Sequence, residues 1–328
     1  MIGLAIGAIV AALVFDFLNG FHDAANSIAT IVGTRILKPL PAVGISAFAN
    51  FVGPFLFGVA VATTIGKGLI NPDFVTLNII IGALAGAIVW DIITWILGLP
   101  TSSSHALVGG IIGAGLAGAG AKAIIFGGLQ TVVKGIVISP IAGLVTAFLI
   151  ALLIMRLFAK AKPHTVNSVF GKLQLVSSTY FSLTHGANDG QKTMGVIALI
   201  LLTQGVITKF EIPYYVILMA ATAMSLGTFF GGWRIVKTMA LKITNLRPYQ
   251  GFSAETGAAT ILATLAWAGI PASTTHAISG GIMGVGAVRR LSAVRWGVGK
   301  RIVWAWIITI PASTAVSFAI TLIINGLH

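Results

Sequence analysis

Apolar residues fill long runs along the whole chain, and short polar phrases separate these runs. The runs cover residues 2–17, 24–37, 42–65, 74–99, 106–119, 123–154, 173–183, 193–207, 213–232, 252–270, 277–288 and 302–324. A helix needs ~20 apolar residues to cross a bilayer, and inside lipid every backbone N–H and C=O must be bonded within the membrane-embedded structure. No run shows the alternation of a barrel strand. The pattern therefore predicts an all-α polytopic membrane protein.

Composition narrows this prediction. Hydrophobic residues make up 57% of the 328 positions and charged residues only 8%, whereas about 25% of a soluble domain is charged. The absence of cysteine excludes a disulfide framework and a thiolate metal site. The apolar start lacks a basic flank and a small-residue cleavage site, so we expect a first membrane segment and not a cleaved signal peptide.

The net charge of +13 comes mainly from basic residues in short gaps between apolar runs, at 156–172, 234–247 and 289–301. Cytoplasmic loops of membrane proteins carry such an excess of Lys and Arg. The loops account for most of the positive charge, and a nucleic-acid partner is not needed to explain it. We expect a multi-pass protein of the cytoplasmic membrane, in contact with membrane lipid, whose basic loops face the cytoplasm.

Two polar phrases occur twice in the chain, in the same order. The first reads Gly-Phe-His-Asp-Ala-Ala-Asn-Ser at 20–27 and Gly-Ala-Asn-Asp-Gly-Gln-Lys-Thr at 186–193. The second reads Pro-Thr-Ser-Ser-Ser-His at 100–105 and Pro-Ala-Ser-Thr-Thr-His at 271–276. Because polar residues are costly in a membrane, duplicated polar phrases predict a transport site shared between two repeats. A basic gap containing a proline divides the chain into an expected first transmembrane repeat, 1–162, and a second, 163–328.

The two Ser/Thr phrases have the composition of helix N-termini. A Ser/Thr run that follows a proline and precedes an apolar run is typical of an N-cap. The first N–H groups of such a helix have no partner within it, and the helix dipole adds positive character. Two such ends would bind a tetrahedral oxyanion without Arg or Lys, unless their hydroxyls only cap the helices. The candidate anion ligands are Ser102, Ser103, Ser104, Ser273, Thr274 and Thr275.

The two Asp phrases have the composition of a cation site. Asp23 and Asp189 are surrounded by apolar sequence, and a carboxylate in a membrane segment usually faces a partner, an ion or a water-filled path. Asp, Asn and hydroxyl oxygens, together with unwound backbone carbonyls, suit a hard monovalent cation. Asn26 and Asn188 are therefore further candidate ligands. The alternative is that each Asp is only paired with a helix N–H or with Lys192.

Glycines flank the Asp phrases at Gly20, Gly186 and Gly190, and we expect them to permit unwinding of the helix there. Lys192 stands where the first phrase has Asn26. The two cation sites therefore cannot be chemically identical.

The remaining titratable residues give weaker signals. His22 and His185 are candidate proton relays, so H⁺ coupling stays open beside Na⁺ coupling. Glu255 lies inside an apolar run and is a candidate coupling or gating residue, whereas Asp91, its rough analogue in the first half, could equally lie at the membrane interface. We expect Asp16 to be solvated because it lies near the end of a run.

The Ser-His pairs at 104–105 and 275–276 raise the question of an intramembrane hydrolase. No acidic residue stands close to either pair, and the duplication argues against a single nucleophile. We therefore expect a protein that is not an enzyme and needs no organic cofactor.

Together, the phrases resemble a known family. Residues 20–30 and 185–189 look like the amino-terminal and carboxy-terminal signatures of the inorganic phosphate transporter (PiT) family. The two Ser/Thr phrases and Gly-Phe-Ser-Ala-Glu at 251–255 are similar to further hallmarks, and the resemblance covers essentially the whole chain. It implies two inverted-topology repeats with about 12 membrane segments, including re-entrant helical hairpins. It also implies symport of inorganic phosphate with Na⁺ or H⁺.

By this resemblance the six Ser/Thr residues would bind phosphate, and Asp23, Asn26 and Asp189 would carry the coupling ions. We expect Na⁺, because Asp and Asn with hydroxyls resemble an oxygen cage more than a proton relay. Glu255 matches an acid regarded as important for transport in animal relatives. Alternatives are an H⁺-coupled or metal-phosphate symporter, a sulfate permease of the same fold, and an anion channel. A homodimer is a further expectation, since such transporters often form one.

Overall fold

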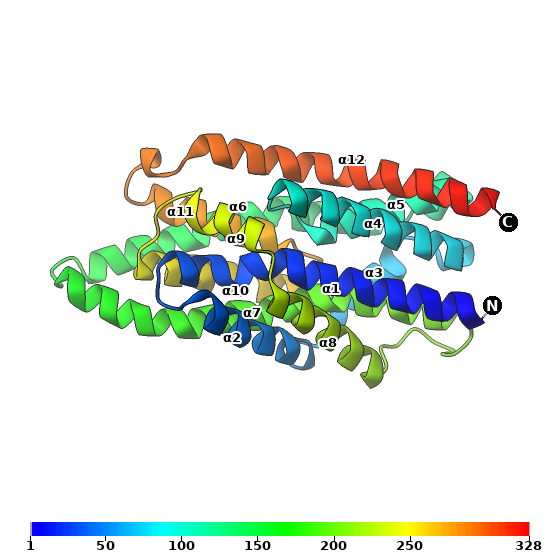
Figure 1. Cartoon of the computed structure of the whole chain (residues 1–328), viewed down its shortest axis with the longest axis horizontal. Coiled ribbons are helices and arrows are strands. Elements are labelled where there is room, and N and C mark those ends of the chain that lie inside the picture. Colours follow the sequence, from blue (N-terminus) through cyan, green and yellow to red (C-terminus); the bar gives the residue numbers. More distant parts are fainter. Residues whose placement is uncertain (1, 328) are drawn as a thin grey trace.

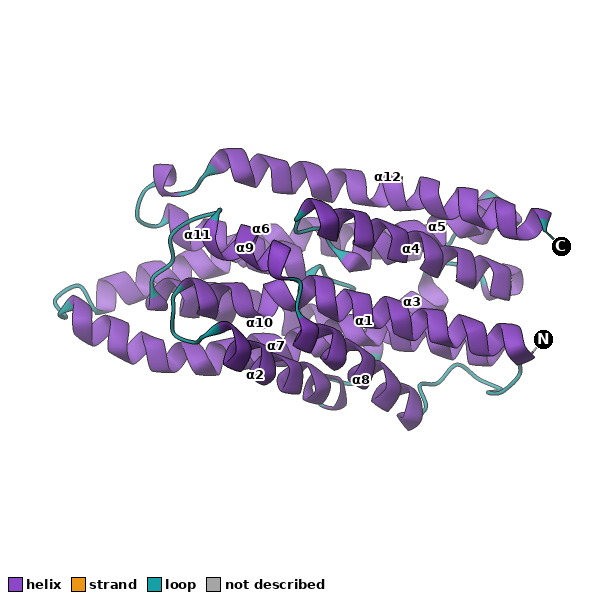
Figure 2. Cartoon of the chain, viewed as in Figure 1, coloured by secondary structure: helices purple, strands orange, loops and turns teal. Residues whose placement is uncertain are grey.

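The computed structural model describes residues 2–327, and its elements are helices joined by loops (Figure 2). The first half contains α1 (Ile2–Gly33), α2 (Pro39–Val52), α3 (Ala60–Gly68), α4 (Leu77–Leu97), α5 (Ser103–Ala119) and α6 (Phe126–Leu157). The second half contains α7 (Pro163–Thr203), α8 (Tyr214–Phe230), α9 (Trp233–Leu241), α10 (Pro248–Trp267), α11 (Thr274–Ala287) and α12 (Trp296–Gly326). Short 3₁₀ helices occur at Gly53–Phe55, Pro72–Phe74, Ala121–Ala123 and Leu291–Ala293.

The order of elements repeats. Each half has a long helix, a bent pair, one further helix, a short helix that follows a Ser/Thr phrase, and a long last helix with an internal proline, Pro140 in α6 and Pro311 in α12. In Figure 1 the start of α1 and the end of α12 lie at the right-hand end of the bundle, and the loop between α6 and α7 lies at the left. The long helices of the second half therefore run opposite to those of the first (Figure 1).

Within residues 2–327, four helices are long and apolar enough to cross a membrane: α1, α4, α6 and α12. The pairs α2–α3 and α8–α9 each bend sharply, by 75° and 68°, and would raise the number of spans to six if each pair is one broken span. The predicted all-helical, multi-pass architecture is confirmed. The total of about 12 membrane segments stays a prediction.

The unwinding predicted around the Asp phrases is wrong, because both phrases lie inside unbroken helices, α1 and α7. Gly20 and Gly186 serve close packing instead. A Cβ at Gly20 would collide with the backbone of Met224, and one at Gly186 with the backbone of Asn50. Small residues let membrane helices approach in this way while each helix keeps its own backbone hydrogen bonds.

The short helices α5 and α11 join the two halves. A Cβ at Gly113 of α5 would meet the backbone of α12 at Thr314, and one at Gly280 of α11 would meet the backbone of α6 at Pro140. Each short helix thus packs against the last long helix of the other half. Because α5 packs on α12 and α11 packs on α6, the Ser/Thr phrases of the two halves lie in the middle of the bundle, where α1 and α7 also pass.

Candidate substrate and cation site

The Ser/Thr phrases form helix N-termini, as predicted. Ser102 is the N-cap of α5 and accepts a hydrogen bond from the backbone N–H of His105 at 3.4 Å. Ser273 is the N-cap of α11 and accepts one from the backbone N–H of His276 at 3.2 Å. The cap oxygens are therefore already engaged. Ser103, Ser104, Thr274 and Thr275 are the hydroxyls of the first helical turns, and all four are buried.

The two phrases meet across the middle of the molecule. The rings of His105 and His276 contact edge to face, with centroids 4.4 Å apart. His276 also stacks on Trp306 at 3.9 Å, and the indole N–H of Trp306 donates to the carbonyl of Pro100 at 3.0 Å. Ring packing holds the start of α5 beside the start of α11. Two helix N-termini, each with positive partial charge, therefore lie next to one another.

Asp189 of α7 reaches both Ser/Thr phrases. Thr274 Oγ1 donates to Asp189 Oδ2 at 2.8 Å, and Ser104 Oγ lies 3.5 Å from Asp189 Oδ1. His185 Nε2 is 3.2 Å from Asp189 Oδ2, one helical turn earlier on the same helix. The Asp189 side chain is fully buried, so these contacts and an ion pair compensate its charge.

That ion pair is with Lys192, whose side chain is only 1% exposed. The Lys192 ammonium contacts Asp189 Oδ1 and Ser104 Oγ, and it donates to the carbonyl oxygen of Ala272 at 3.0 Å. It therefore bridges the helix that carries the second Asp phrase and the starts of both short helices. The structure thus contains the Asp189–Lys192 pair that the sequence analysis gave as the alternative to a cation site.

Asp23 of α1 faces Thr275. Thr275 Oγ1 lies 3.4 Å and 3.5 Å from the two carboxylate oxygens of Asp23, and His22 Nδ1 lies 2.9 Å from Asp23 Oδ1. The Asn26 amide donates to Thr275 Oγ1 at 2.9 Å and lies 3.4 Å from Thr274 Oγ1. Asn26 Oδ1 is buried and has no hydrogen-bond partner within residues 2–327. The first Asp phrase thus leaves one buried oxygen atom, Asn26 Oδ1, without a donor, and such an atom is free to bind a cation.

The two halves of the site share one space. Single ligand atoms of Asp23, His185 and Asp189 all lie within 4.8 Å of one another. This is close enough for one cation to contact residues of both α1 and α7. Contacts between the predicted residues bring together both Asp residues, Asn26, Lys192, both histidines and the hydroxyls of Ser104, Thr274 and Thr275. The Ser103 hydroxyl is buried but has no hydrogen-bond partner within residues 2–327.

Glu255 lies in a separate buried cluster. Thr30 donates to Glu255 Oε1 at 2.6 Å and the Gln174 amide donates to the same oxygen at 3.1 Å, while Ser177 contacts the other oxygen. The cluster links α10 to α1 and α7. The Asn188 amide makes a long contact, 3.5 Å, to the carbonyl of Leu262, and its Oδ1 has no hydrogen-bond partner within residues 2–327.

Three buried residues near the site carry signals that sequence reasoning missed. The expectation that Asp16 is solvated is wrong: its side chain is fully buried. Asn50 Oδ1, which can only accept a hydrogen bond, lies 3.0 Å from His185 Nδ1, and Thr101 Oγ1 lies 3.4 Å from His22 Nε2. Thr101 belongs to a duplicated phrase, and Asn50 is a polar residue in an apolar run, so both were visible in principle. Their partners lie more than 70 residues away in sequence, so the sequence alone does not reveal these contacts.

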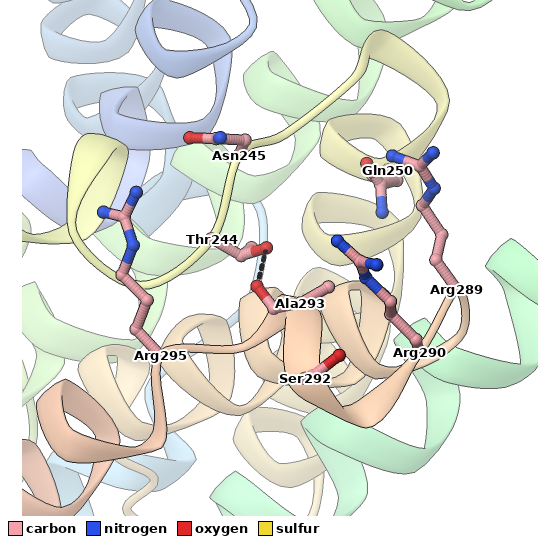
Figure 3. Close-up of a pocket in the computed structure, with 8 residues that line it drawn as sticks. All are labelled: Thr244, Asn245, Gln250, Arg289, Arg290, Ser292, Ala293 and Arg295. Carbon is pink, nitrogen blue, oxygen red and sulfur yellow. Dashed lines mark hydrogen bonds between the residues drawn. The ribbon is translucent and has the colours of Figure 1, made fainter.

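A separate cavity of about 470 Å³ lies where the loop before α10 meets the loop after α11 (Figure 3). Its lining includes the exposed side chains of Arg289, Arg290 and Arg295. No residue of the Asp or Ser/Thr phrases lines it. Both loops lie toward the left-hand end of the bundle in Figure 1, as does the loop between α6 and α7. This end carries a concentrated positive charge, and the candidate site lies elsewhere.

Comparison with known proteins gives agreeing results. A model described as the phosphate transporter family matches residues 19–317. A Rhizobium meliloti protein named "Probable low-affinity inorganic phosphate transporter" is 54% identical over 315 residues, which are 96% of this chain and 94% of that protein. A Bacillus subtilis protein of the same name is 42% identical over 325 residues, covering 98% and 97%. A solved structure described as "The sodium-dependent phosphate transporter" is 27% identical and matches 99% of this chain and 100% of its own, with a TM-score of 0.89.

Proposed function

Since the chain belongs to the phosphate transporter family, we propose that it is a secondary active symporter that moves inorganic phosphate across the cytoplasmic membrane together with Na⁺. The family and the named relatives are transporters and not enzymes, which confirms the exclusion of a hydrolase. Its long apolar helices make the chain a multi-pass membrane protein. Phosphate is the substrate of the family, and the coupling ion is the proposed part.

The observation that carries the proposal is the meeting of both Ser/Thr phrases with both Asp phrases. Phosphate would bind at the starts of α5 and α11, where backbone N–H groups and the hydroxyls of Ser103, Ser104, Thr274 and Thr275 are available. Ser102 and Ser273 would support this site as caps. Three of these hydroxyls, those of Ser104, Thr274 and Thr275, also contact the two carboxylates, so cation and anion would bind in contact.

The cation would bind beside Asp23, with the unpartnered Asn26 Oδ1 as a second ligand and Thr275 Oγ1 within reach. These are hard oxygen ligands of the kind that hold Na⁺ in transporters. Asp189 faces the same space from α7. A cation there would offset the negative charge of phosphate, so each ligand would strengthen the binding of the other.

Two inverted repeats would account for the arrangement of the helices. The starts of both halves lie at opposite ends of the bundle, and corresponding long helices run in opposite directions (Figure 1). A pseudo-two-fold axis in the membrane plane would then pass near the touching rings of His105 and His276. Alternating access would come from movement of one helix group against the other, with the Glu255 cluster joining α10 to α1 and α7. The basic end would face the cytoplasm.

Specific contacts also support H⁺ or a metal-phosphate complex as the co-transported species. His22 contacts Asp23 and His185 contacts Asp189, which gives each carboxylate a residue able to exchange a proton. Asp23, His185 and Asp189 together offer three ligand atoms to a divalent metal. Na⁺ remains the proposal because the unpartnered Asn26 Oδ1 beside Asp23 is a hard amide oxygen and because the similar solved structure is described as sodium-dependent.

Uptake of radiolabelled phosphate into proteoliposomes tests the proposal. The purified protein is reconstituted and given an inward Na⁺ gradient, an inward H⁺ gradient, both or neither, with the membrane potential clamped. Parallel sets contain excess sulfate, or a divalent metal with and without a chelator. The proposal predicts uptake that needs the Na⁺ gradient, ignores the chelator and resists sulfate.

Other outcomes identify the alternative. Uptake driven by the H⁺ gradient overturns Na⁺ coupling, and uptake that a chelator abolishes indicates a metal-phosphate complex. Suppression by sulfate would show a broader oxyanion site, and uptake independent of every gradient would indicate a channel.

The anion site is tested by Thr275→Val, with Thr222→Val on the exposed face of α8 as a matched control. A hydrogen bond to a charged group contributes about 1.5–3 kcal/mol, so the KM for phosphate should rise roughly tenfold or more in Thr275→Val only.

A further inference from the structure

Lys192 gives the site a cation of its own. We propose that its ammonium group permanently occupies the cation position of the second half, so that each transport cycle takes a solute cation only beside Asp23. This inference rests on the proposed function, and it fixes how many cations accompany each phosphate. It follows from the position of Lys192 in the repeat, from its ligands, and from the contrast with Asn26.

Lys192 and Asn26 are equivalent positions in the two halves. Asn26 is three residues after Asp23, and Lys192 is three residues after Asp189. Asn26 donates to Thr275, the third residue of the second Ser/Thr triplet, and Lys192 donates to Ser104, the third residue of the first. Each therefore reaches from its own long helix to the short helix of the other half. The two side chains make the same contact in mirrored places, one with a neutral amide and one with a full positive charge.

The ligands of the Lys192 ammonium are those of a hard monovalent cation. They are a carboxylate oxygen of Asp189, the hydroxyl of Ser104 and the backbone carbonyl of Ala272. An ammonium has three donors, and these three oxygens match them. Transporters bind Na⁺ with the same classes of oxygen. Since the side chain is 1% exposed, the ammonium fills this position, and a solute cation would have to displace it.

The first half lacks such an internal cation. Asn26 Oδ1 is buried without a partner within residues 2–327, and Asp23 forms an ion-pair contact only with His22 among those residues. Asp23 and Thr275, the counterparts of two Lys192 ligands, are thus contacted by an imidazole and an amide and, within the described residues, by no ammonium. A solute cation would take the place of that ammonium there.

Two functional consequences follow. The Lys192 ammonium is attached to the chain and is already held in place, so it loses little translational and rotational freedom when phosphate binds. The second half therefore needs no separate step in which a solute cation binds. The charge of the ammonium also remains beside the helix N-termini whether or not Na⁺ is bound. Phosphate should therefore show weak but detectable binding in the absence of Na⁺. One fewer Na⁺ should accompany each phosphate than in a site with two open cation positions.

Lys192→Asn tests the inference, because it gives the second half the residue of the first. In proteoliposomes, the Na⁺ dependence of initial phosphate uptake and the reversal potential give the number of Na⁺ ions per phosphate. The expected result is one more Na⁺ per phosphate than in the unmodified protein, with one more elementary charge moved. Lys192→Arg keeps the charge and should keep the original number.

Asn26→Lys makes the reverse exchange, giving the first half the residue of the second. It tests the inference even if Lys192→Asn does not fold. It should remove the remaining cation requirement, so that uptake no longer responds to Na⁺. If cation-driven uptake in the unmodified protein is established and neither variant changes the number of Na⁺ ions, the inference is overturned and the proposed function stands. If the unmodified protein shows no cation coupling at all, the proposed function itself fails. The two failures are therefore distinguishable.

Discussion

Removing one member of the buried Lys192–Asp189 pair should destabilise the protein far more than removing both. Lys192→Met deletes the ammonium and leaves the fully buried Asp189 carboxylate with only hydroxyl and imidazole contacts. An uncompensated buried charge of this kind costs about 3–5 kcal/mol. Asp189→Asn leaves the Lys192 ammonium beside the Ser104 hydroxyl and one carbonyl, and it should cost about the same.

The double variant Asp189→Asn/Lys192→Met should recover most of this loss, because replacing both charges of a buried pair is often nearly neutral. The free energy of unfolding is measured by denaturant titration of the purified protein in mixed micelles. Lys209→Met is the control, since Lys209 pairs with Glu211 at 3.7 Å with both side chains exposed, and such a surface pair contributes at most about 1 kcal/mol. Single variants as stable as the control, or a double variant as unstable as the singles, would refute the reasoning.

The remaining predictions concern uptake and assembly. Asp23→Asn removes the proposed cation ligand, and Asp189→Asn removes the partner of the Lys192 ammonium. Each should abolish coupled phosphate uptake in protein that is still inserted in the membrane, and near-normal, cation-dependent uptake in both would contradict these roles. Gly280→Val places a Cβ against a backbone carbonyl of α6 and should displace α11. The loss of folded protein would be measured by size-exclusion chromatography. Gly7→Val, at a position with open space, is the control and should not change the elution profile. Glu255→Gln should lower the maximal uptake rate about tenfold while the KM for phosphate changes little, because a charge-assisted hydrogen bond contributes about 1.5 kcal/mol or more; a KM effect larger than the rate effect would place Glu255 at the phosphate site.

The helical class and the two capped helix starts could be predicted from the sequence because their causes are local. Long apolar runs require helices in lipid, and a proline followed by Ser or Thr before an apolar run specifies an N-cap. Ser102 and Ser273 take that role. The unwinding predicted at Gly20 and Gly186 was wrong, because these glycines allow a neighbouring helix to pack closely against α1 and α7. Nothing in the phrase itself shows that α8 or α2 passes there.

The burial of Asp16 had a local signal that was not used. Asp16, Asn19, Asp23, Asn26 and Thr30 follow one another at three- or four-residue spacing and are all buried in α1. This is the period of one helix face, so the polar stripe extends further than the duplicated phrase. In contrast, the partners across the site have no local signal. Asn26 and Thr275 are 249 residues apart, and only the packing of the short helices between the halves brings them into contact.

The unlike residues at the two equivalent positions also account for the charge of the site. Of the two carboxylates in the Asp phrases, Asp189 pairs with the Lys192 ammonium, whereas Asp23 has no Lys or Arg partner within residues 2–327. An isolated charge in a membrane-embedded site is costly, and one monovalent cation beside Asp23 would neutralise it. With Asn in place of Lys192 the same site would need two cations before it could accept an anion. A single residue in a duplicated framework would therefore set the number of ions that accompany phosphate, while the helix starts that hold phosphate remain paired.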